Sequence, residues 1–286
     1  MTTTTPTHTA RRTVTQDEVS ALRTAVRAIL PTPASGTDSD ASPVHAFVLA
    51  HTLADTTVRE LAEAEPEPVS VVHLGQDIRI AHPIRPGEQI TVTLDVLGAR
   101  REPRGTRVAV RARLTAPDGT DRAELHTGAL LLGARAIEPF GQIPAAAAPA
   151  PLGGPGEPAH AEHTLTPHWI RGYAQASGDL NPIHLDARAA RDAGFPNVIA
   201  HGMSVLALAL EEIADRYADG DITRVVAVSG RFSAPVTPGH TLRIELTPDT
   251  GPSLVRFTCR TPDSIAVKSG WAQLAPTGPL PDGHHG

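Results

Sequence analysis

The segment from Tyr173 to Met203 holds the residues whose types and spacing could do chemistry: YAQASGDLNPIHLDARAARDAGFPNVIAHGM. Asp179 and His184 flank an Asn-Pro pair at residues 181–182. A carboxylate and an imidazole brought to one spot can hold a water molecule between them and exchange protons with a substrate at neutral pH. Asp, Asn and Pro are also the usual residues of turns, so this spacing taken alone is more typical of a structural loop.

A helix must end just before these residues if they are to meet. Thr166 and Pro167 are typical of a helix start, with Thr as the N-cap and Pro at the first helical position. We expect the helix to stop at Gly178, because glycine adopts positive φ without strain. Asp179 then leaves the helix in a turn, and His184 emerges on its far side.

A His-Gly pair at residues 201–202 precedes a second element, the apolar run GMSVLALALEEIADRY. We expect Gly202 to open a long helix, where its backbone N–H is one of the donors without an acceptor inside the helix. Such a donor can stabilise negative charge on a carbonyl oxygen, and glycine lets a ligand approach the backbone closely. Taken alone, a small residue placed at a helix start for packing is the simpler interpretation.

The chain divides near its midpoint at a segment rich in Pro, Ala and Gly, residues 138–158, which we interpret as a linker. The two halves are related: HPIRPGEQITVTL and APVTPGHTLRIEL align without gaps, each with a Pro-Gly turn before an alternating apolar run. We expect an N-terminal repeat over residues 13–137 and a C-terminal repeat over residues 159–277. Residues 1–12 and 278–286 are predicted to be disordered tails.

Each half also has an apolar helix before its strands, VHAFVLAHTLADTTVREL in the first half and the helix from Gly202 in the second. A continuous apolar helix followed by antiparallel strands predicts a sheet wrapped around a buried helix. We therefore predict an α+β fold in which two such repeats pack as a pseudo-dimer.

Composition argues against several other classes of protein. The net charge is −6, from 25 basic and 31 acidic residues, which argues against nucleic acid as a partner. The single cysteine, Cys259, excludes an internal disulfide and a cysteine-based metal cluster. His160, His163 and His168 fall on a strand and a helix cap rather than on one face, and no nucleotide-binding motif occurs, so no metal and no other cofactor are expected. No signal peptide or membrane-spanning run is seen, which predicts a cytoplasmic protein without membrane contact.

Taken together, the run YAQASGDLNPIHLD…AGFPNVIAHGM resembles the MaoC-like, or (R)-specific enoyl-CoA hydratase, family of hot-dog-fold proteins. The shared signature is an aromatic residue, then Asp-x-Asn-Pro-x-His, then His-Gly-Met at the start of the hot-dog helix. The match covers residues 173–203, and the duplicated organisation of the rest resembles a double hot dog.

The resemblance implies a role for each residue of the signature. Asp179 and His184 would be the catalytic dyad that activates water for addition to a 2-enoyl thioester, or in reverse dehydrates an (R)-3-hydroxyacyl thioester. The N–H of Gly202 would hold the thioester oxygen. Four further residues would bind the substrate or support the dyad: Tyr173, Asn181, His201 and Met203.

The first half lacks the signature. The repeat register places Leu49 and Ala50 opposite His201 and Gly202, and no Asp-x-Asn-Pro-x-His occurs among residues 14–45. The resemblance to double hot-dog proteins in which one half is commonly inactive implies one active site per chain. The other half would complete the pseudo-dimer and provide an acyl-chain pocket.

The expected partner is a thioester of CoA or of an acyl carrier protein, and the sequence leaves a homodimer open. Three alternatives remain beside the hydratase: a hot-dog acyl thioesterase, a polyketide or natural-product tailoring dehydratase acting on a carrier-bound intermediate, and a non-catalytic acyl-binding subunit. An intact dyad disfavours the last of these.

Overall fold

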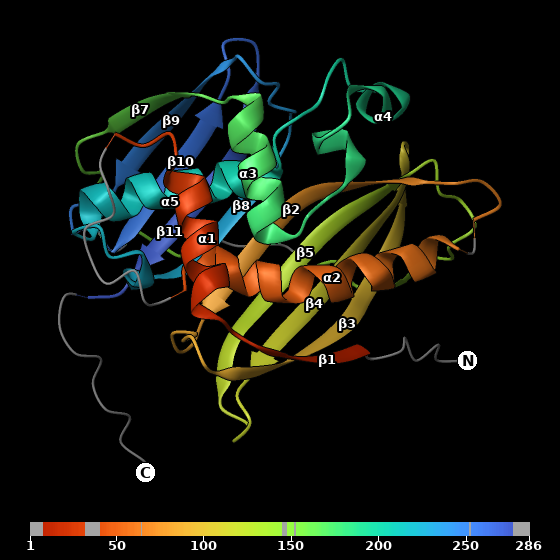
Figure 1. The fold of residues 1–286 in the computed structure, drawn as a ribbon, viewed down its shortest axis with the longest axis horizontal. Coiled ribbons are helices and arrows are strands. Elements are labelled where there is room, and N and C mark those ends of the chain that lie inside the picture. Colours follow the sequence, from red (N-terminus) through yellow and green to blue (C-terminus); the bar gives the residue numbers. More distant parts are fainter. Residues whose placement is uncertain are drawn as a thin grey trace.

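The computed structural model describes residues 8–31, 41–63, 65–144, 148–151, 153–251 and 253–276 of the 286. Its elements form two series of the same order (Figure 1). The N-terminal series is β1 (His8–Thr13), α1 (Gln16–Arg27), α2 (Pro43–Ala62), β2 (Ser70–Ile80), β3 (Gln89–Glu102), β4 (Gly105–Thr115) and β5 (Asp121–Leu132). The C-terminal series is β7 (Ala159–Thr164), α3 (Pro167–Ser177), α5 (Gly202–Tyr217), β8 (Val225–Phe232), β9 (Thr241–Pro248), β10 (Leu254–Arg260) and β11 (Ile265–Leu274). Between them lies β6 (Phe140–Gly141), and the C-terminal series adds the short helices η1 (Pro182–His184), α4 (Ala187–Asp192) and η2 (Ile222–Arg224).

The strands form one eleven-stranded sheet, in the order β1-β3-β4-β5-β2-β8-β11-β10-β9-β7, with β6 beside β3. The order is symmetric about its centre: β1 at one end corresponds to β7 at the other, and β2 corresponds to its neighbour β8. The repeats are therefore related by a pseudo-twofold axis. The axis lies between β2 and β8, where Asp77 pairs with Ser229 in antiparallel register and the Ser229 hydroxyl donates to the Asp77 carboxylate. The duplication predicted from the two Pro-Gly segments is thus a structural repeat.

The two Pro-Gly turns have the same backbone geometry. The N–H of Gly87 donates to the carbonyl oxygen of Val14, and the N–H of Gly239 donates to that of Leu165, each over 2.8 Å. Both glycines have positive φ, 83° and 89°, which explains the residue type at these positions. In each repeat the turn therefore joins the start of the third strand, β3 or β9, to a residue just before the first helix.

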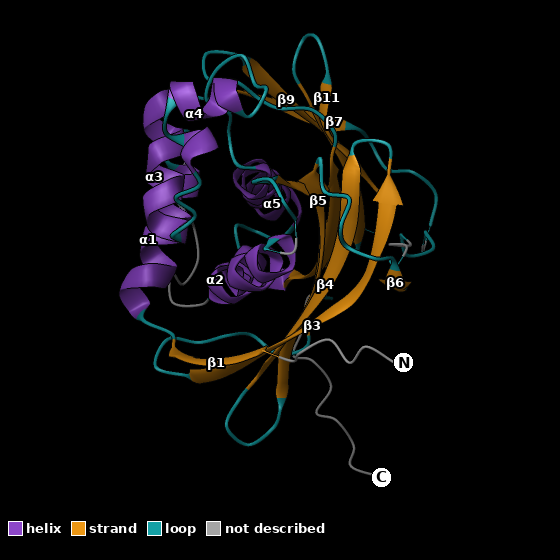
Figure 2. Ribbon diagram, turned by 90° about the vertical axis from the view of Figure 1, so that its right-hand side faces the viewer, coloured by secondary structure: helices purple, strands orange, loops and turns teal. Residues whose placement is uncertain are grey.

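Three layers make up the molecule. The sheet curves around α2 and α5, and α1 and α3 pack against each other outside these two helices (Figure 2). One apolar core runs through both repeats, from Val19 and Leu22 of α1 to Leu206 and Leu210 of α5. This is the α+β double hot-dog architecture that the resemblance implied.

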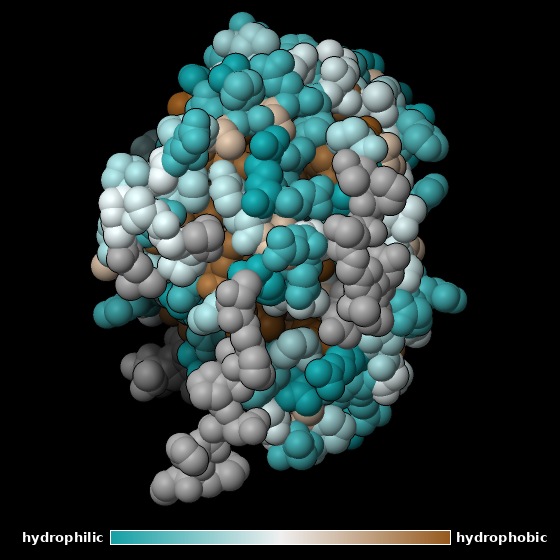
Figure 3. Space-filling view, turned by 90° about the vertical axis from the view of Figure 1, so that its left-hand side faces the viewer, coloured by the Kyte–Doolittle hydropathy of each residue, from teal (hydrophilic) through white to brown (hydrophobic). Residues whose placement is uncertain are grey.

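Polar contacts also join the two repeats. The indole N–H of Trp169 on α3 donates to the carbonyl oxygen of Val26 on α1 over 3.0 Å, inside the core. On the face shown in Figure 3, polar side chains predominate and apolar atoms are seen mainly in recesses between them. No helix in the described parts of the chain has the length and apolar character needed to cross a bilayer.

Two expectations about the chain outside the repeats need correction. Residues 8–12 were expected to belong to a disordered tail, but they form most of β1, which pairs with β3. The expected linker is also partly ordered, since Phe140 and Gly141 form β6 and Phe140 packs against the N-terminal core. The predicted C-terminal tail, residues 278–286, lies outside the described residues.

Candidate active site

The helix that precedes the acid and the base begins and ends where the sequence predicts. The side-chain oxygen of Thr166 accepts the backbone N–H of Trp169 over 3.1 Å, and Pro167 is the first helical residue of α3. Gly178 ends the helix with a φ of 74°, and its N–H donates to the carbonyl oxygen of Ala174. Asp179 is therefore the first residue to leave a well-capped helix end.

The turn after α3 is held by two of its own side chains, whose oxygens accept backbone N–H groups within the turn. The carboxylate Oδ1 of Asp179 accepts the backbone N–H of Asn181 over 3.3 Å. The side-chain oxygen of Asn181 accepts the N–H of Ile183 over 3.4 Å, which caps the short helix η1. Asn181 thus supports Asp179 through its backbone N–H, whereas its side-chain oxygen stabilises the turn that carries His184.

His184 has a defined tautomer when it is neutral. Its Nδ1 lies 2.8 Å from the carbonyl oxygen of Ile199, and a carbonyl can only accept, so Nδ1 carries the proton and Nε2 is left as a base. The side chain is buried, and this burial lowers the pKa of the imidazole against the raising effect of the Ile199 carbonyl and Asp179. At neutral pH His184 is therefore uncharged.

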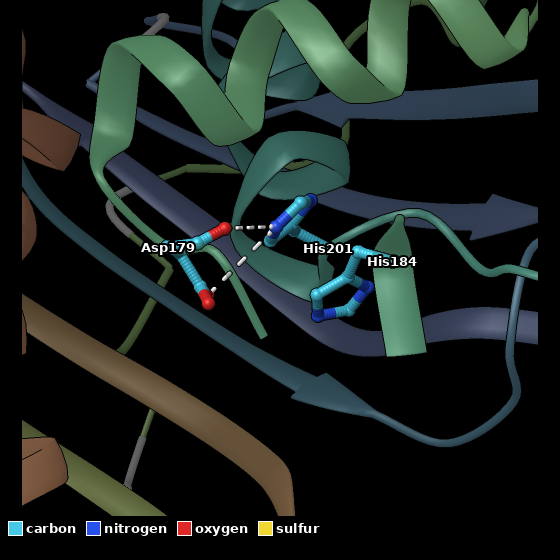
Figure 4. A group of neighbouring side chains, drawn as sticks. All are labelled: Asp179, His184 and His201. Atoms are coloured by element: carbon cyan, nitrogen blue, oxygen red, sulfur yellow. Dashed lines mark hydrogen bonds and ion pairs between the residues drawn. The ribbon is translucent and has the colours of Figure 1, made fainter. Parts of the chain in front are cut away.

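Asp179 and the two imidazoles of the signature converge (Figure 4). His201 is 1% exposed, and its Nε2 lies 3.0 Å from the backbone oxygen of Asp179 and 4.0 Å from Oδ2. The His184 and His201 rings stack, with centroids 3.6 Å apart. Burial and the neighbouring His184 lower the pKa of His201 to about 4, so this second imidazole is also neutral at pH 7.

The Asp179 carboxyl stays ionised in this place. Burial acts to raise its pKa, but the ion-pair contact with His51 and the charges that the neighbouring imidazoles gain in acid hold the pKa well below its usual range. The site therefore combines an ionised carboxylate with a neutral imidazole that has a free nitrogen. This pair can take a proton from water at neutral pH.

The same three side chains could be considered as metal ligands. Each offers one donor atom within 4.8 Å of the others. Two of the ring nitrogens already contact backbone carbonyl oxygens, which can only accept, so in the neutral rings these two nitrogens carry protons and are not metal donors. This arrangement fits proton transfer better than coordination.

Tyr173 and Met203, expected at the substrate, are core residues. Tyr173 is fully buried, and its ring lies 5.0 Å from the His201 ring, so it supports that imidazole from behind. Among the described residues its hydroxyl has no hydrogen-bond partner. Met203 is 2% exposed and packs in the core that joins both repeats. Both shape the site without forming its accessible surface.

Gly202 is the first residue of α5, as the sequence predicts. Its backbone N–H therefore belongs to the helix N-terminus, where negative charge is favoured. A Cβ at this position would lie 2.8 Å from the ring of Phe232, so the tight packing of β8 against α5 also demands glycine. The packing interpretation and the functional one are compatible here.

The sequence interpretation missed His51. This residue lies on α2 of the N-terminal repeat, and its Nε2 is 3.6 Å from Oδ1 of Asp179. It was overlooked because the N-terminal repeat lacks the signature and its register placed Leu49 and Ala50 opposite the His-Gly pair. The available signal was an imidazole within the apolar run of α2.

A cavity of about 540 Å³ opens beside Gly178, the residue before Asp179, although Asp179, His184 and His201 are not among its lining residues. It lies between α2, which contributes Val48, Leu49 and Thr52, and the end of α3, which contributes Ala176 and Gly178. The N-terminal repeat thus forms one wall of the space next to the dyad-bearing turn.

Comparison with known proteins agrees with this geometry. Residues 153–250 match the family model of the MaoC like domain. The C-terminal repeat is a MaoC-like domain. Its relatives include the peroxisomal enoyl-CoA hydratase 2 of Arabidopsis thaliana, 46% identical over 70 residues, which are 24% of this chain and 23% of the relative. The 3-hydroxyacyl-thioester dehydratase X of Mycobacterium tuberculosis is 47% identical over 72 residues, 25% of this chain and 24% of that protein.

The likeness of structure extends over both repeats. A MaoC-like dehydratase from Phytophthora capsici superposes with a TM-score of 0.78 and covers 96% of each chain, at 21% sequence identity. The MaoC-like sequence match is confined to the C-terminal repeat and the linker before it, whereas the fold is shared by the whole chain. The chain spans about a quarter of the length of the two relatives.

Proposed function

We propose that this chain catalyses the reversible hydration of a 2-enoyl thioester to an (R)-3-hydroxyacyl thioester, as a hydro-lyase with Asp179 and His184 as its proton-transferring pair. The observation that carries the proposal is the convergence of an ionised carboxylate, a neutral imidazole and a helix N-terminus within a MaoC-like domain. The names of the two relatives, an enoyl-CoA hydratase and a 3-hydroxyacyl-thioester dehydratase, support the same class of reaction.

The chemistry follows from the protonation states. In hydration, a water between Asp179 and His184 gives a proton to this pair as its oxygen adds to the β-carbon. The electrons move to the thioester oxygen, to which the N–H of Gly202 would donate. The pair then returns a proton to the α-carbon, so the protein neither gains nor loses a proton over the cycle.

The proposal includes one such site per chain, with the repeat at residues 13–137 supplying a wall of the substrate space rather than a second dyad. The acyl group would be carried by CoA or by an acyl carrier protein, and no cofactor takes part in this scheme. We also place the protein in the cytoplasm and propose a homodimer, which light scattering would test.

Crotonyl-CoA and butyryl-CoA together test the reaction class. A hydratase adds water to crotonyl-CoA, seen as loss of enoyl-thioester absorbance, and releases no CoA from the saturated ester. Release of CoA from butyryl-CoA without hydration would instead assign a thioesterase. The product should be the (R)-3-hydroxy isomer when analysed by chiral chromatography.

Two substitutions test the dyad. Asp179→Asn and His184→Ala should each lower kcat by about 10²- to 10⁴-fold, the usual contribution of a general acid or base. Asp192→Asn is the matched control, because that carboxylate is 74% exposed and lies on the nearby helix α4. Full activity of either dyad variant would overturn the assignment.

A further inference from the structure

Each repeat places an imidazole next to the Asp179 carboxylate. His201 of the C-terminal repeat approaches Oδ2, and His51 of the N-terminal repeat approaches Oδ1 with 3.6 Å between Nε2 and the oxygen. The His51 and Asp179 side chains are 21% and 16% exposed, so most of the water around them is excluded. The His51 contact crosses from one repeat to the other.

An aromatic cluster holds the His51 ring. Phe47, one turn earlier on α2, lies 5.2 Å from it between ring centroids. Phe47 in turn stacks on His73 of β2 at 5.6 Å, and His73 meets the ring of Phe232 edge-on at 4.9 Å. Phe232 is the residue that packs against Gly202. A continuous series of contacts therefore runs from α2 to the start of α5, through His51, Phe47, His73, Phe232 and Gly202.

The charges around His51 favour an ion pair with Asp179. Asp179 faces it from the turn after α3 and Asp55 from α2, and both favour the imidazolium, whereas Arg59 on α2 opposes it. Burial lowers the pKa of His51, yet the Asp179 contact leaves that pKa above the ordinary value.

The pKa values of the neighbouring histidines are lowered, whereas that of His51 is raised. The charge of His51 disfavours the protonated forms of His73, His184 and His201. A charged His51 therefore keeps Asp179 ionised and its neighbouring imidazoles neutral.

We propose that His51 is a positioning residue of this active site: its imidazole, supplied by the repeat that lacks the signature, holds the Asp179 carboxylate ionised and oriented toward the reacting water. The inference rests on the proposed hydratase function. It implies that the MaoC-like repeat does not contain the complete site and that the N-terminal repeat contributes a polar group as well as a wall.

Kinetics of His51→Ala and His51→Gln separate charge from orientation. His51→Ala should lower kcat about tenfold to a hundredfold, as expected for loss of a polar contact to a partly buried charged group, with a smaller effect on KM. The acidic fall of kcat/KM should move to higher pH, because the cation that disfavoured protonation of Asp179 and His184 is gone. Glutamine can still donate a hydrogen bond, so His51→Gln should recover much of kcat while the pH profile stays shifted.

His82→Gln is the control, since His82 is an exposed residue of the same repeat in the loop after β2. It should leave kcat and the pH profile unchanged. A His51→Ala enzyme with the wild-type pH profile and kcat would overturn the proposal. A His51→Gln enzyme whose kcat is no higher than that of His51→Ala would also overturn it. A donor at this position would then contribute nothing to orienting Asp179.

A titration that does not depend on activity distinguishes this inference from the proposed function. Side-chain NMR of the histidines in the intact protein would give the pKa of His51 in the wild type and in Asp179→Asn. We expect the substitution to lower it by about one unit, because the carboxylate that favours the imidazolium is removed. An unchanged His51 pKa in an active hydratase overturns the inference alone. If the His51 pKa is lowered but the protein hydrates no enoyl thioester, the His51–Asp179 contact is supported and the proposed hydratase function is overturned.

Discussion

His184 Nδ1 donates to the carbonyl oxygen of Ile199 over 2.8 Å, and this bond leaves Nε2 of the neutral ring as the nitrogen available for proton transfer. Burial, acting against that bond, lowers the pKa of the imidazole from its ordinary 6.5. A histidine that must be neutral to act as a base loses function when it is protonated. The pH dependence of the reaction should therefore report this residue.

We expect kcat/KM for crotonyl-CoA hydration to be constant near neutral pH and to fall only below about pH 6.5, the pKa of an unperturbed histidine. The fall is on the acidic side because protonation of His184 removes the base. Steady-state rates in overlapping buffers would measure it. An enzyme that loses activity as pH rises through 7 would show that the protonated imidazole is the working form.

Gly202→Ala should damage both packing and catalysis. The added Cβ would lie 2.8 Å from the Phe232 ring, so α5 or β8 must shift. We expect a loss of about 1–3 kcal/mol in the free energy of unfolding, as for other overpacked cores. A displaced helix N-terminus should also lower kcat. Urea unfolding and crotonyl-CoA kinetics give the two quantities.

Gly172→Ala is the control for that substitution, since Gly172 lies in α3 and a Cβ there meets nothing within 4 Å. It should be neutral or stabilising by up to about 1 kcal/mol. Gly202→Ala combined with Phe232→Leu should recover stability. If the double variant is no more stable than Gly202→Ala alone, the contact with Phe232 is not the cause.

Arg27→Met should destabilise the whole chain. Arg27 lies 2.6 Å from Glu211 and 3.0 Å from Asp215 on α5, and its side chain is 6% exposed. Among the described residues, removing Arg27 leaves Glu211 paired with Arg23 alone, so we expect a loss below the ~3–5 kcal/mol of a buried charge left without a partner. Denaturant unfolding should show this loss in one transition, because the pair joins the two repeats.

Arg59→Met provides the comparison for that measurement. Arg59 pairs with Asp55 on the surface of α2, with a side chain that is 65% exposed. Its loss should change the free energy of unfolding by no more than about 0.5 kcal/mol. Equal effects of the two substitutions would contradict the burial argument.

Stability should decline in acid because of His201. Burial lowers its pKa to about 4 in the folded state, whereas the unfolded chain has an ordinary histidine at 6.5. Between these values the unfolded chain binds more protons, so stability is present above about pH 6.5 and is lost as pH falls toward 4. The loss amounts to about 3 kcal/mol for a shift of this size.

Thermal or urea unfolding between pH 7 and pH 4 would follow this decline, and His201→Gln should make the pH dependence shallower. His82→Gln should leave it as in the wild type, because that imidazole is exposed. An unchanged slope in His201→Gln would assign the acid sensitivity to other groups.

The parts of the site that depend on near neighbours in the chain could be predicted from the sequence. Thr166 caps α3, Gly178 ends it, and Gly202 opens α5, because caps and turns are made by residues a few positions apart. An α+β fold of two related repeats was also predictable, since the repeated Pro-Gly turns and alternating strands show in the sequence, and the resemblance at residues 173–203 implied the double hot dog. The reaction class came from the signature at residues 173–203 rather than from any single residue.

Other features depend on contacts between segments far apart in the chain. β1 looked like a tail because its polar sequence gains stability only by pairing with the edge of β3. Asn181 was expected to bind the substrate or support the dyad, and only the folded turn shows its backbone N–H bonded to Asp179.

The contact between His51 and Asp179 also depends on the tertiary structure. No local pattern joins an imidazole on α2 to a carboxylate after α3, because that contact exists only once the pseudo-twofold packs one repeat against the other. The sequence alone indicated which residues could carry the proposed chemistry and where α3 and α5 begin. The tertiary structure decided which distant side chains surround them, since burial and charge at Asp179 arise from the packing of both repeats.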